Sequence, residues 1–114
     1  MMTKQEFRNY LSGGIHFLDG ATGSNLMLSG MPKGCCAEKW ILEHPQPLLA
    51  LQQGYVQAGS DIIYAPTFQA NPIALEKEGL ADKTEEINAR LIALSRQAAP
   101  DCLIAGDLAT LATH

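Results

Sequence analysis

The sequence predicts an α/β fold, built as the first three β/α units of a (β/α)8 TIM barrel. Three short apolar runs, at residues 15–18, 61–65 and 102–105, have the length and composition of strands. Segments with helical spacing of apolar residues separate them, and this alternation implies a parallel sheet with right-handed crossovers. The connections from strand to helix are long, whereas those from helix to strand are short. This asymmetry is typical of a (β/α) barrel or doubly wound sheet whose functional face lies at the carboxyl ends of the strands.

Three strands cannot close such a barrel, which needs eight strands and typically about 250 residues. The chain has 114 residues, and we therefore expect residues 1–114 to form the N-terminal part of one barrel domain, with no second domain. An end soon after the third strand would leave a strand edge and two helix faces without partners. We expect a further segment or another copy of the chain to complete the barrel. A self-sufficient small α/β layer is the alternative.

Composition argues against several classes of protein. The net charge is −4, and lysine and arginine form no cluster of the kind that binds nucleic acid. No apolar run approaches the roughly 20 residues that span a bilayer, and the first residues lack the apolar core of a signal peptide. The three cysteines, two of them adjacent, form no disulfide framework. These features favour a cytoplasmic protein that binds neither nucleic acid nor membrane.

The first expected helix begins with a capping box at Thr3–Glu6 and ends at the glycine pair Gly13–Gly14. The first strand, residues 15–18, follows directly. A long excursion then runs from residue 19 to about residue 44, and one helical turn is expected within it at residues 25–28. The second helix is expected to start at Pro45, because proline suits the first turn of a helix, and to end near Gly59.

After the second strand, Asn71 is expected to cap a short helical piece that ends by Gly79. Residues 82–85 fit a second capping box. The helix that follows is the clearest in the chain, because its apolar residues recur at spacings of four, three and four. These residues are Ile87, Leu91, Leu94 and Ala98. Pro100 then ends the helix, and the third strand occupies residues 102–105.

The turn at residues 19–24, Asp-Gly-Ala-Thr-Gly-Ser, is the strongest candidate for a binding site. It lacks the lysine of a phosphate-binding P-loop and the glycine spacing of a dinucleotide fingerprint. An amino-acid pocket fits better. Asp19 would accept hydrogen bonds from a substrate ammonium, and free N–H groups of the glycine turn would bind the substrate carboxylate. The alternative is a tight turn in which Asp19 is only a local cap, and spacing alone leaves both interpretations open.

Three further side chains are candidates for the pocket wall. Thr67 and Phe68 follow the second strand, where they could supply a hydroxyl contact and an apolar wall. Thr67 could equally satisfy backbone groups, and Phe68 could pack under its loop. Trp40, the only tryptophan, lies in the long first excursion. It could cover a site or anchor that excursion to the core.

No metal site is expected within this chain. Cys35 and Cys36 are adjacent thiols without a third or fourth ligand at the spacing of a known zinc motif. Cys102 starts the third strand and is expected to be buried as a small hydrophobe. The three histidines, His16, His44 and His114, show no ligand spacing.

Six short sequence blocks, taken together and in order, resemble the homocysteine S-methyltransferases, including the homocysteine-binding module of cobalamin-dependent methionine synthase. The blocks are residues 18–24 (LDGATGS), 43–45 (EHP), 58–63 (AGSDII), 67–71 (TFQAN), 79–80 (GL) and 104–106 (IAG). Each block is weak alone, whereas the ordered set is specific and extends over nearly the whole chain. The resemblance implies a (β/α)8 barrel that transfers a methyl group to the thiol of homocysteine.

The resemblance also implies roles for particular residues and cofactors. Asp19, Gly20 and Ala21 would hold the amino-acid end of homocysteine, and Thr67, Phe68 and Trp40 would line the pocket. Zinc would lower the pKa of the substrate thiol, but the family's zinc-binding cysteines lie beyond position 114, so none of these ligands is present. The resemblance leaves the methyl donor open among those that the family uses: methylcobalamin, S-methylmethionine, S-adenosylmethionine and betaine. With methylcobalamin as donor, a cobalamin-binding domain or protein would be a partner.

One departure from the family pattern leaves alternatives open. Residues 107–110, Asp-Leu-Ala-Thr, stand where the family usually has a glycine-proline turn. The protein could therefore act on another methyl acceptor or a corrinoid partner. A different class of function is a non-catalytic, truncated half-barrel that only self-associates.

Overall fold

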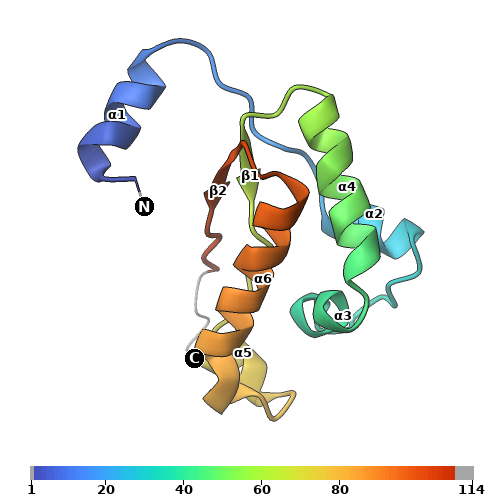
Figure 1. Ribbon diagram of the computed structural model, residues 1–114. Coiled ribbons are helices and arrows are strands. Elements are labelled where there is room, and N and C mark those ends of the chain that lie inside the picture. Colours follow the sequence, from blue (N-terminus) through green and yellow to red (C-terminus); the bar gives the residue numbers. More distant parts are fainter. Residues whose placement is uncertain (1, 110–114) are drawn as a thin grey trace.

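The computed structural model describes residues 2–109, and within them the predicted α/β class is confirmed (Figure 1). The fold is mostly helical, with a small parallel sheet. Its elements are α1 (Lys4–Ser12), α2 (Gly23–Leu28), α3 (Ala37–Glu43), α4 (Pro45–Gln57), β1 (Ile62–Tyr64), α5 (Pro72–Glu76), the 3-10 turn η1 (Ala81–Lys83), α6 (Thr84–Ala98) and β2 (Leu103–Ala105). Residues 110–114 lie outside the described residues, and they include Thr110, the last residue of the block 107–110 that departs from the family pattern.

The sheet consists of β1 and β2, which pair in parallel with Ile63 opposite Ile104. The chain before the candidate turn runs alongside β1 but forms only an isolated parallel bridge, between Leu18 and Ile62. Two backbone hydrogen bonds fix this alignment: the N–H of Ile62 donates to the carbonyl of Phe17 at 3.1 Å, and the N–H of Asp19 donates to the carbonyl of Ile62 at 3.1 Å.

The prediction of a full strand at residues 15–18 is therefore wrong. Ile15 is 84% exposed and Phe17 is 61% exposed, so neither side chain gains a packed face. Within residues 2–109, the outer edge of this segment has no strand beside it. Because these side chains bury no face, the segment stays extended without forming a ladder.

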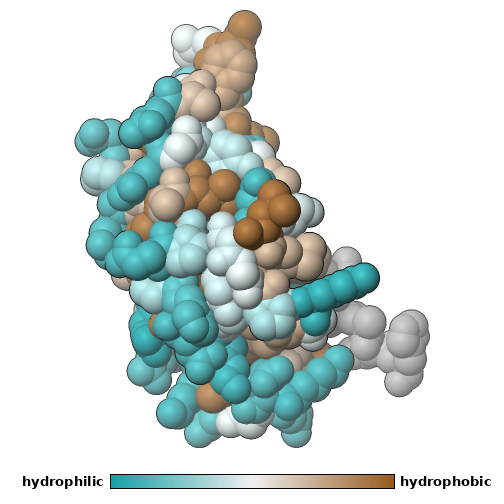
Figure 2. Space-filling view, turned by 90° about the vertical axis from the view of Figure 1, so that its right-hand side faces the viewer, coloured by the Kyte–Doolittle hydropathy of each residue, from teal (hydrophilic) through white to brown (hydrophobic). Residues whose placement is uncertain are grey.

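The hydrophobic core lies among the helices. Its buried residues come from α2 to α6 and the loops between them; they are Leu26, Met31, Ile41, Leu48, Ala70, Leu75, Ile87 and Leu91. Helices α4 and α6 pack against each other, and α6 also packs against β2. On the face that carries α2 and α4, hydrophilic side chains cover the lower part and apolar ones gather in the centre and toward the top (Figure 2).

Several helix boundaries match the sequence signals. Thr3 and Glu6 form the expected capping box at the start of α1. Gly59, just after α4, has a φ of 109°, a left-handed conformation that favours glycine at the end of a helix. The side chain of Asn71 caps α5 by accepting a hydrogen bond from the N–H of Ala74 at 2.9 Å. These helix ends depend on residues within a few positions of the end itself, which explains why the sequence predicts them.

Two other predictions need correction. The excursion between residues 19 and 44 contains a second helix, α3, in addition to the turn now seen as α2. The second capping box, at residues 82–85, does not form, because the chain passes directly from η1 into α6. In this arrangement the hydroxyl of Thr84 donates to the carbonyl of Ala81 at 2.7 Å, and no side chain caps α6.

The helical core provides a direct test of stability. Leu91 is 0% exposed within it, so Leu91→Ala should lower the free energy of unfolding by about 2–5 kcal/mol through lost burial and the remaining cavity. Leu28→Ala is the matched control, because Leu28 is 86% exposed and its truncation should change stability by less than about 0.5 kcal/mol. Urea unfolding followed by circular dichroism measures both, and equal effects would contradict this assignment of the core.

Candidate functional site

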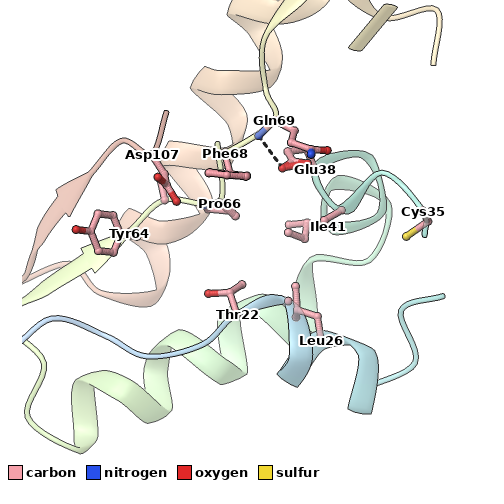
Figure 3. A pocket seen from close by; sticks show the side chains of 13 residues that line it. Thr22, Leu26, Cys35, Glu38, Ile41, Tyr64, Pro66, Phe68, Gln69 and Asp107 are labelled. Carbon is pink, nitrogen blue, oxygen red and sulfur yellow. Dashed lines mark hydrogen bonds between the residues drawn. The ribbon is translucent and has the colours of Figure 1, made fainter. Parts of the chain in front are cut away.

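A pocket of about 380 Å³ lies beside the segments that leave the carboxyl ends of β1 and β2 (Figure 3). Its wall comes from α2, α3, the segment after β1 and the segment after β2. The lining residues include Thr22, Leu26, Glu38, Ile41, Tyr64, Phe68, Gln69 and Asp107. The lining includes two carboxylates, Glu38 and Asp107, and no lysine or arginine. The pocket therefore has an acidic character and favours a ligand that carries a positive charge.

Asp19 lies next to this pocket, at the start of the candidate turn. Its carboxylate accepts a hydrogen bond from the N–H of Tyr64, a lining residue, at 3.4 Å. Partial burial raises the pKa of the Asp19 carboxyl above its usual value; the N–H groups of Tyr64 and of Asp19 itself oppose this rise, and the Asp107 carboxylate adds to it. Asp19 and Asp107 thus follow the two segments that pair with β1, one on each side of that strand.

Gly20 is held against an aromatic ring from α4. A Cβ atom at residue 20 would lie 2.9 Å from the hydroxyl oxygen of Tyr55 and 3.0 Å from its Cε1 atom. The contact with the hydroxyl is shorter than Cβ atoms make in proteins, so a side chain at residue 20 would require the Tyr55 ring to shift. Glycine lets the turn approach the ring without that shift.

Ala21 is fixed through its carbonyl group. The Tyr55 hydroxyl donates to this oxygen at 2.6 Å, and the Nδ2 group of Asn25 donates to it at 2.9 Å. By contrast, the N–H groups of Gly20 and Ala21 donate to no acceptor within residues 2–109. The turn thus combines one carboxylate with two free amide donors.

Thr67 and Phe68 have different surroundings. Thr67 is 5% exposed, and its hydroxyl both donates to the carbonyl of Asp107 at 3.0 Å and accepts from the N–H of Asp107 at 2.9 Å. It therefore joins the exits of β1 and β2. Phe68 is about half exposed and lines the pocket. Of the candidates named from the sequence, Phe68 lines the pocket, Asp19 is hydrogen-bonded to the lining residue Tyr64, and Thr67 is bonded to the lining residue Asp107.

Trp40 is placed on α3, away from the pocket lining. Its ring stacks on His44, with centroids 4.8 Å apart, and it packs against the hydrophobic core. These contacts attach α3 to the rest of the fold. They correspond to the interpretation in which Trp40 anchors its segment to the core.

Glu38 is a site residue that the sequence reasoning missed. Its side chain is 4% exposed, and its Oε1 atom accepts a hydrogen bond from the N–H of Gln69 at 3.1 Å (Figure 3). This bond joins α3 to the segment that carries Phe68. No helix was expected at residues 37–43, so nothing placed Glu38 beside Ile41. On α3 these two residues are three positions apart and share the face that lines the pocket.

The cysteines do not form a metal site in the part of the chain from residue 2 to residue 109. Cys35 is exposed, Cys36 is half-buried, and the Cys36 thiol lies 4.0 Å from an oxygen of Glu38. Burial raises the pKa of the Cys36 thiol, the N–H of Lys39 opposes the rise, and the Glu38 carboxylate adds to it. No three histidine, cysteine or acidic side chains gather as metal ligands in this range. The described residues therefore do not fit the tetrahedral zinc that the family resemblance implies.

The other cysteine and histidines have structural contacts. Cys102 is half-buried, not fully buried as predicted, and its thiol donates to the carbonyl of Ser60 at 3.4 Å. His16 stacks on Tyr10 with ring centroids 3.9 Å apart. His114 lies outside the described residues. No helix within residues 2–109 has the length and apolarity required to cross a bilayer.

Two solved structures have a fold similar to that of this chain. The chain is similar to the crystal structure of the homocysteine methyltransferase MmuM from Escherichia coli in its metallated form, with a TM-score of 0.77 and 22% sequence identity. The oxidized form of the same enzyme gives a TM-score of 0.75 and 23% identity. The match covers 90% of this chain but only 41% of the metallated MmuM chain. This likeness establishes the fold over that part.

The amino-acid sequence gives independent information about the family. The profile of the family described as homocysteine S-methyltransferase matches residues 16–114. That range begins just before the candidate turn and includes β1, α6 and β2, so the match extends over most of the chain. The chain belongs to the homocysteine S-methyltransferase family.

Proposed function

We propose that this chain supplies the amino-acid-binding part of a homocysteine S-methyltransferase, as the first three β/α units of a (β/α)8 barrel. The family match and the MmuM-like fold support the general activity. Since the chain spans 41% of the MmuM chain, the activity is proposed for the complete protein. The reaction is the transfer of a methyl group to the thiol sulfur of homocysteine.

The observation that carries this proposal is the pairing of opposite binding groups on one turn. The Asp19 carboxylate can accept hydrogen bonds from an ammonium group, and the unoccupied N–H groups of Gly20 and Ala21 can donate to a carboxylate. An α-amino acid carries both of these charged groups on one carbon atom. We infer that the backbone end of homocysteine binds at residues 19–21.

The pocket beside this turn offers room for the rest of the substrate. Phe68, Leu26 and Ile41 contribute apolar surface to its wall, which suits the two methylene groups of homocysteine. The acidic lining formed by Glu38 and Asp107 favours the ammonium end and disfavours a second carboxylate. Thr67 and Trp40, also proposed from the resemblance, would act on the pocket through the segments that they anchor.

The residues described here bind and orient the amino acid, and no step of methyl transfer is assigned to them. Zinc supplies thiol activation where the family holds it, but the described cysteines and carboxylates do not form its site. A cytoplasmic location is a proposal drawn from the cysteine content, and methylcobalamin as donor and a cobalamin-binding partner are proposals drawn from the family resemblance. The same holds for another methyl acceptor or a corrinoid partner, suggested by residues 107–110.

Replacing Asp19 tests the amino-acid site. Asp19→Asn keeps the size of the side chain but removes the charge that would pair with the ammonium, so the affinity for L-homocysteine should fall about 10-fold or more. Calorimetric titration of the chain measures this change, and Asp82→Asn on the exposed turn η1 is the matched control. Equal affinity of the two variants would contradict the assignment, and an absence of binding by the wild-type chain would remove the basis of the proposed function.

The raised pKa of Asp19 predicts a pH-dependent cost to stability. The folded state holds the Asp19 proton more tightly than the unfolded chain does. The free energy of unfolding therefore falls as the pH rises from the pKa of Asp19 in the unfolded chain to its higher pKa in the folded state. Asparagine cannot ionise, so the free energy of unfolding of Asp19→Asn minus that of the wild type should be larger at pH 7 than at pH 3. Urea unfolding at both pH values checks this, with Asp82→Asn as control. A difference that is the same at both pH values would contradict the sign.

Self-association is a second candidate function, because apolar side chains beside the sheet are exposed. Ile15, Phe17 and Leu18 are 84%, 61% and 51% exposed. An apolar groove of about 680 Å³ also opens between α1 and the sheet, lined in part by Phe7 and Leu103. Surfaces of this kind favour association with another protein surface, including a second copy.

Sedimentation velocity over a range of chain concentrations tests this second candidate. Self-association through the exposed segment predicts a sedimentation coefficient that rises with concentration and a smaller rise for Phe17→Ser. Leu28→Ser is the control, since Leu28 is exposed at the end of α2, away from that segment, and it should behave as the wild type. A monomer at all concentrations would rule out the second candidate.

A further inference from the structure

We propose that Tyr55 is a positioning residue for the part of the site that binds the substrate carboxylate. The inference rests on the proposed function, because it concerns the same amino-acid site. Tyr55 lies on α4, more than 30 positions along the chain from the turn it touches, and its side chain is half-buried. It does not line the pocket, so it acts through the turn at residues 19–21 and not on the substrate.

The first contact is between the Tyr55 ring and Gly20. The ring occupies the space that a side chain at residue 20 would need, with its Cζ atom 3.1 Å from the position of a Cβ atom there. The ring cannot easily move away, because its hydroxyl is anchored on Ala21 at 2.6 Å. The Tyr55 ring therefore limits the movement of the turn at Gly20, one of the residues whose N–H groups are free.

The second contact fixes the peptide group between Ala21 and Thr22. The Ala21 carbonyl accepts hydrogen bonds from both Tyr55 and Asn25, and the Nδ2 group of Asn25 also lies 3.4 Å from the Tyr55 hydroxyl. The carbonyl and the following N–H of a planar trans peptide point in opposite directions. Holding the carbonyl toward α4 thus turns the N–H of Thr22, a pocket-lining residue, to the opposite side. This N–H, like those of Gly20 and Ala21, donates to no acceptor within residues 2–109, and we count it as a third donor available to the substrate carboxylate.

Asp19 is held by other groups. Its N–H donates to Ile62 at 3.1 Å, and its carboxylate accepts from Tyr64 at 3.4 Å. Neither bond involves α4. The ammonium-binding carboxylate and the carboxylate-binding amides of one turn are therefore positioned independently, the first by β1 and the second by Tyr55.

This separation gives the experiment its selectivity. NMR chemical-shift titrations, which suit millimolar affinities, compare L-homocysteine with 3-aminopropane-1-thiol, the same molecule without its carboxylate. Tyr55→Phe keeps the ring against Gly20 and removes only the hydroxyl. It should weaken L-homocysteine about 3- to 10-fold, the range of one neutral hydrogen bond, and leave the affinity for the aminothiol unchanged. Asn25→Ala, which removes the other donor to the same carbonyl, should show the same selective loss.

The control is Tyr10→Phe, because Tyr10 is on α1 and contacts His16 far from the pocket lining. It should alter neither affinity, and thermal unfolding of each variant reports whether the fold is kept. Equal loss of both ligands in Tyr55→Phe would indicate general loosening and overturn the inference, as would no loss of either. If Asp19→Asn abolishes homocysteine binding while Tyr55→Phe does not affect it, the proposed function stands and this inference fails. If the wild-type chain does not bind homocysteine, both fail.

Discussion

The two backbone hydrogen bonds between residues 17–19 and Ile62 determine where everything else in the site can be. They align the segment before the turn with β1, so that the turn begins level with the carboxyl end of that strand. Tyr64, the last residue of β1, then reaches the Asp19 carboxylate with its N–H. The hydroxyl of Thr67 fixes the segment after β2 by bonding to both backbone groups of Asp107. The pocket lies beside the segments that follow β1 and β2, which these bonds hold together.

Much of this arrangement could be predicted from the sequence because it depends on short-range rules. Capping residues such as Thr3 and Asn71, the glycine after α4 and the apolar spacing of α6 all act within a few positions of the chain. The parallel order of β1 and β2 follows from the alternation of elements. The composition of residues 19–21 made this turn a candidate site, and the next residue, Thr22, lines the pocket.

The parts that sequence reasoning missed depend on contacts between distant segments. Residues 15–18 form only a bridge to β1 because Ile15 and Phe17 remain exposed and bury no face against another element. The carboxylate of Glu38 is buried only because the N–H of Gln69, 31 positions later, meets it. Tyr55 has the spacing of an ordinary apolar helix position, and nothing in its local sequence indicates that its hydroxyl binds Ala21. Side chains that support a site from another element leave little local signal.

Helix α1 has a consequence for how the molecule opens. It contains no buried residue, and it joins the rest of the chain through Gly13 and Gly14. Its backbone bonds therefore break without disturbing the core cluster among α2 to α6. The amide protons of α1 should exchange with solvent through local fraying, whereas those of α6 should exchange only when the whole core unfolds. Within residues 2–109 we therefore expect two units that open separately, and we expect residues 19–21 to open with the helical core because Tyr55 and Ile62 hold them to it.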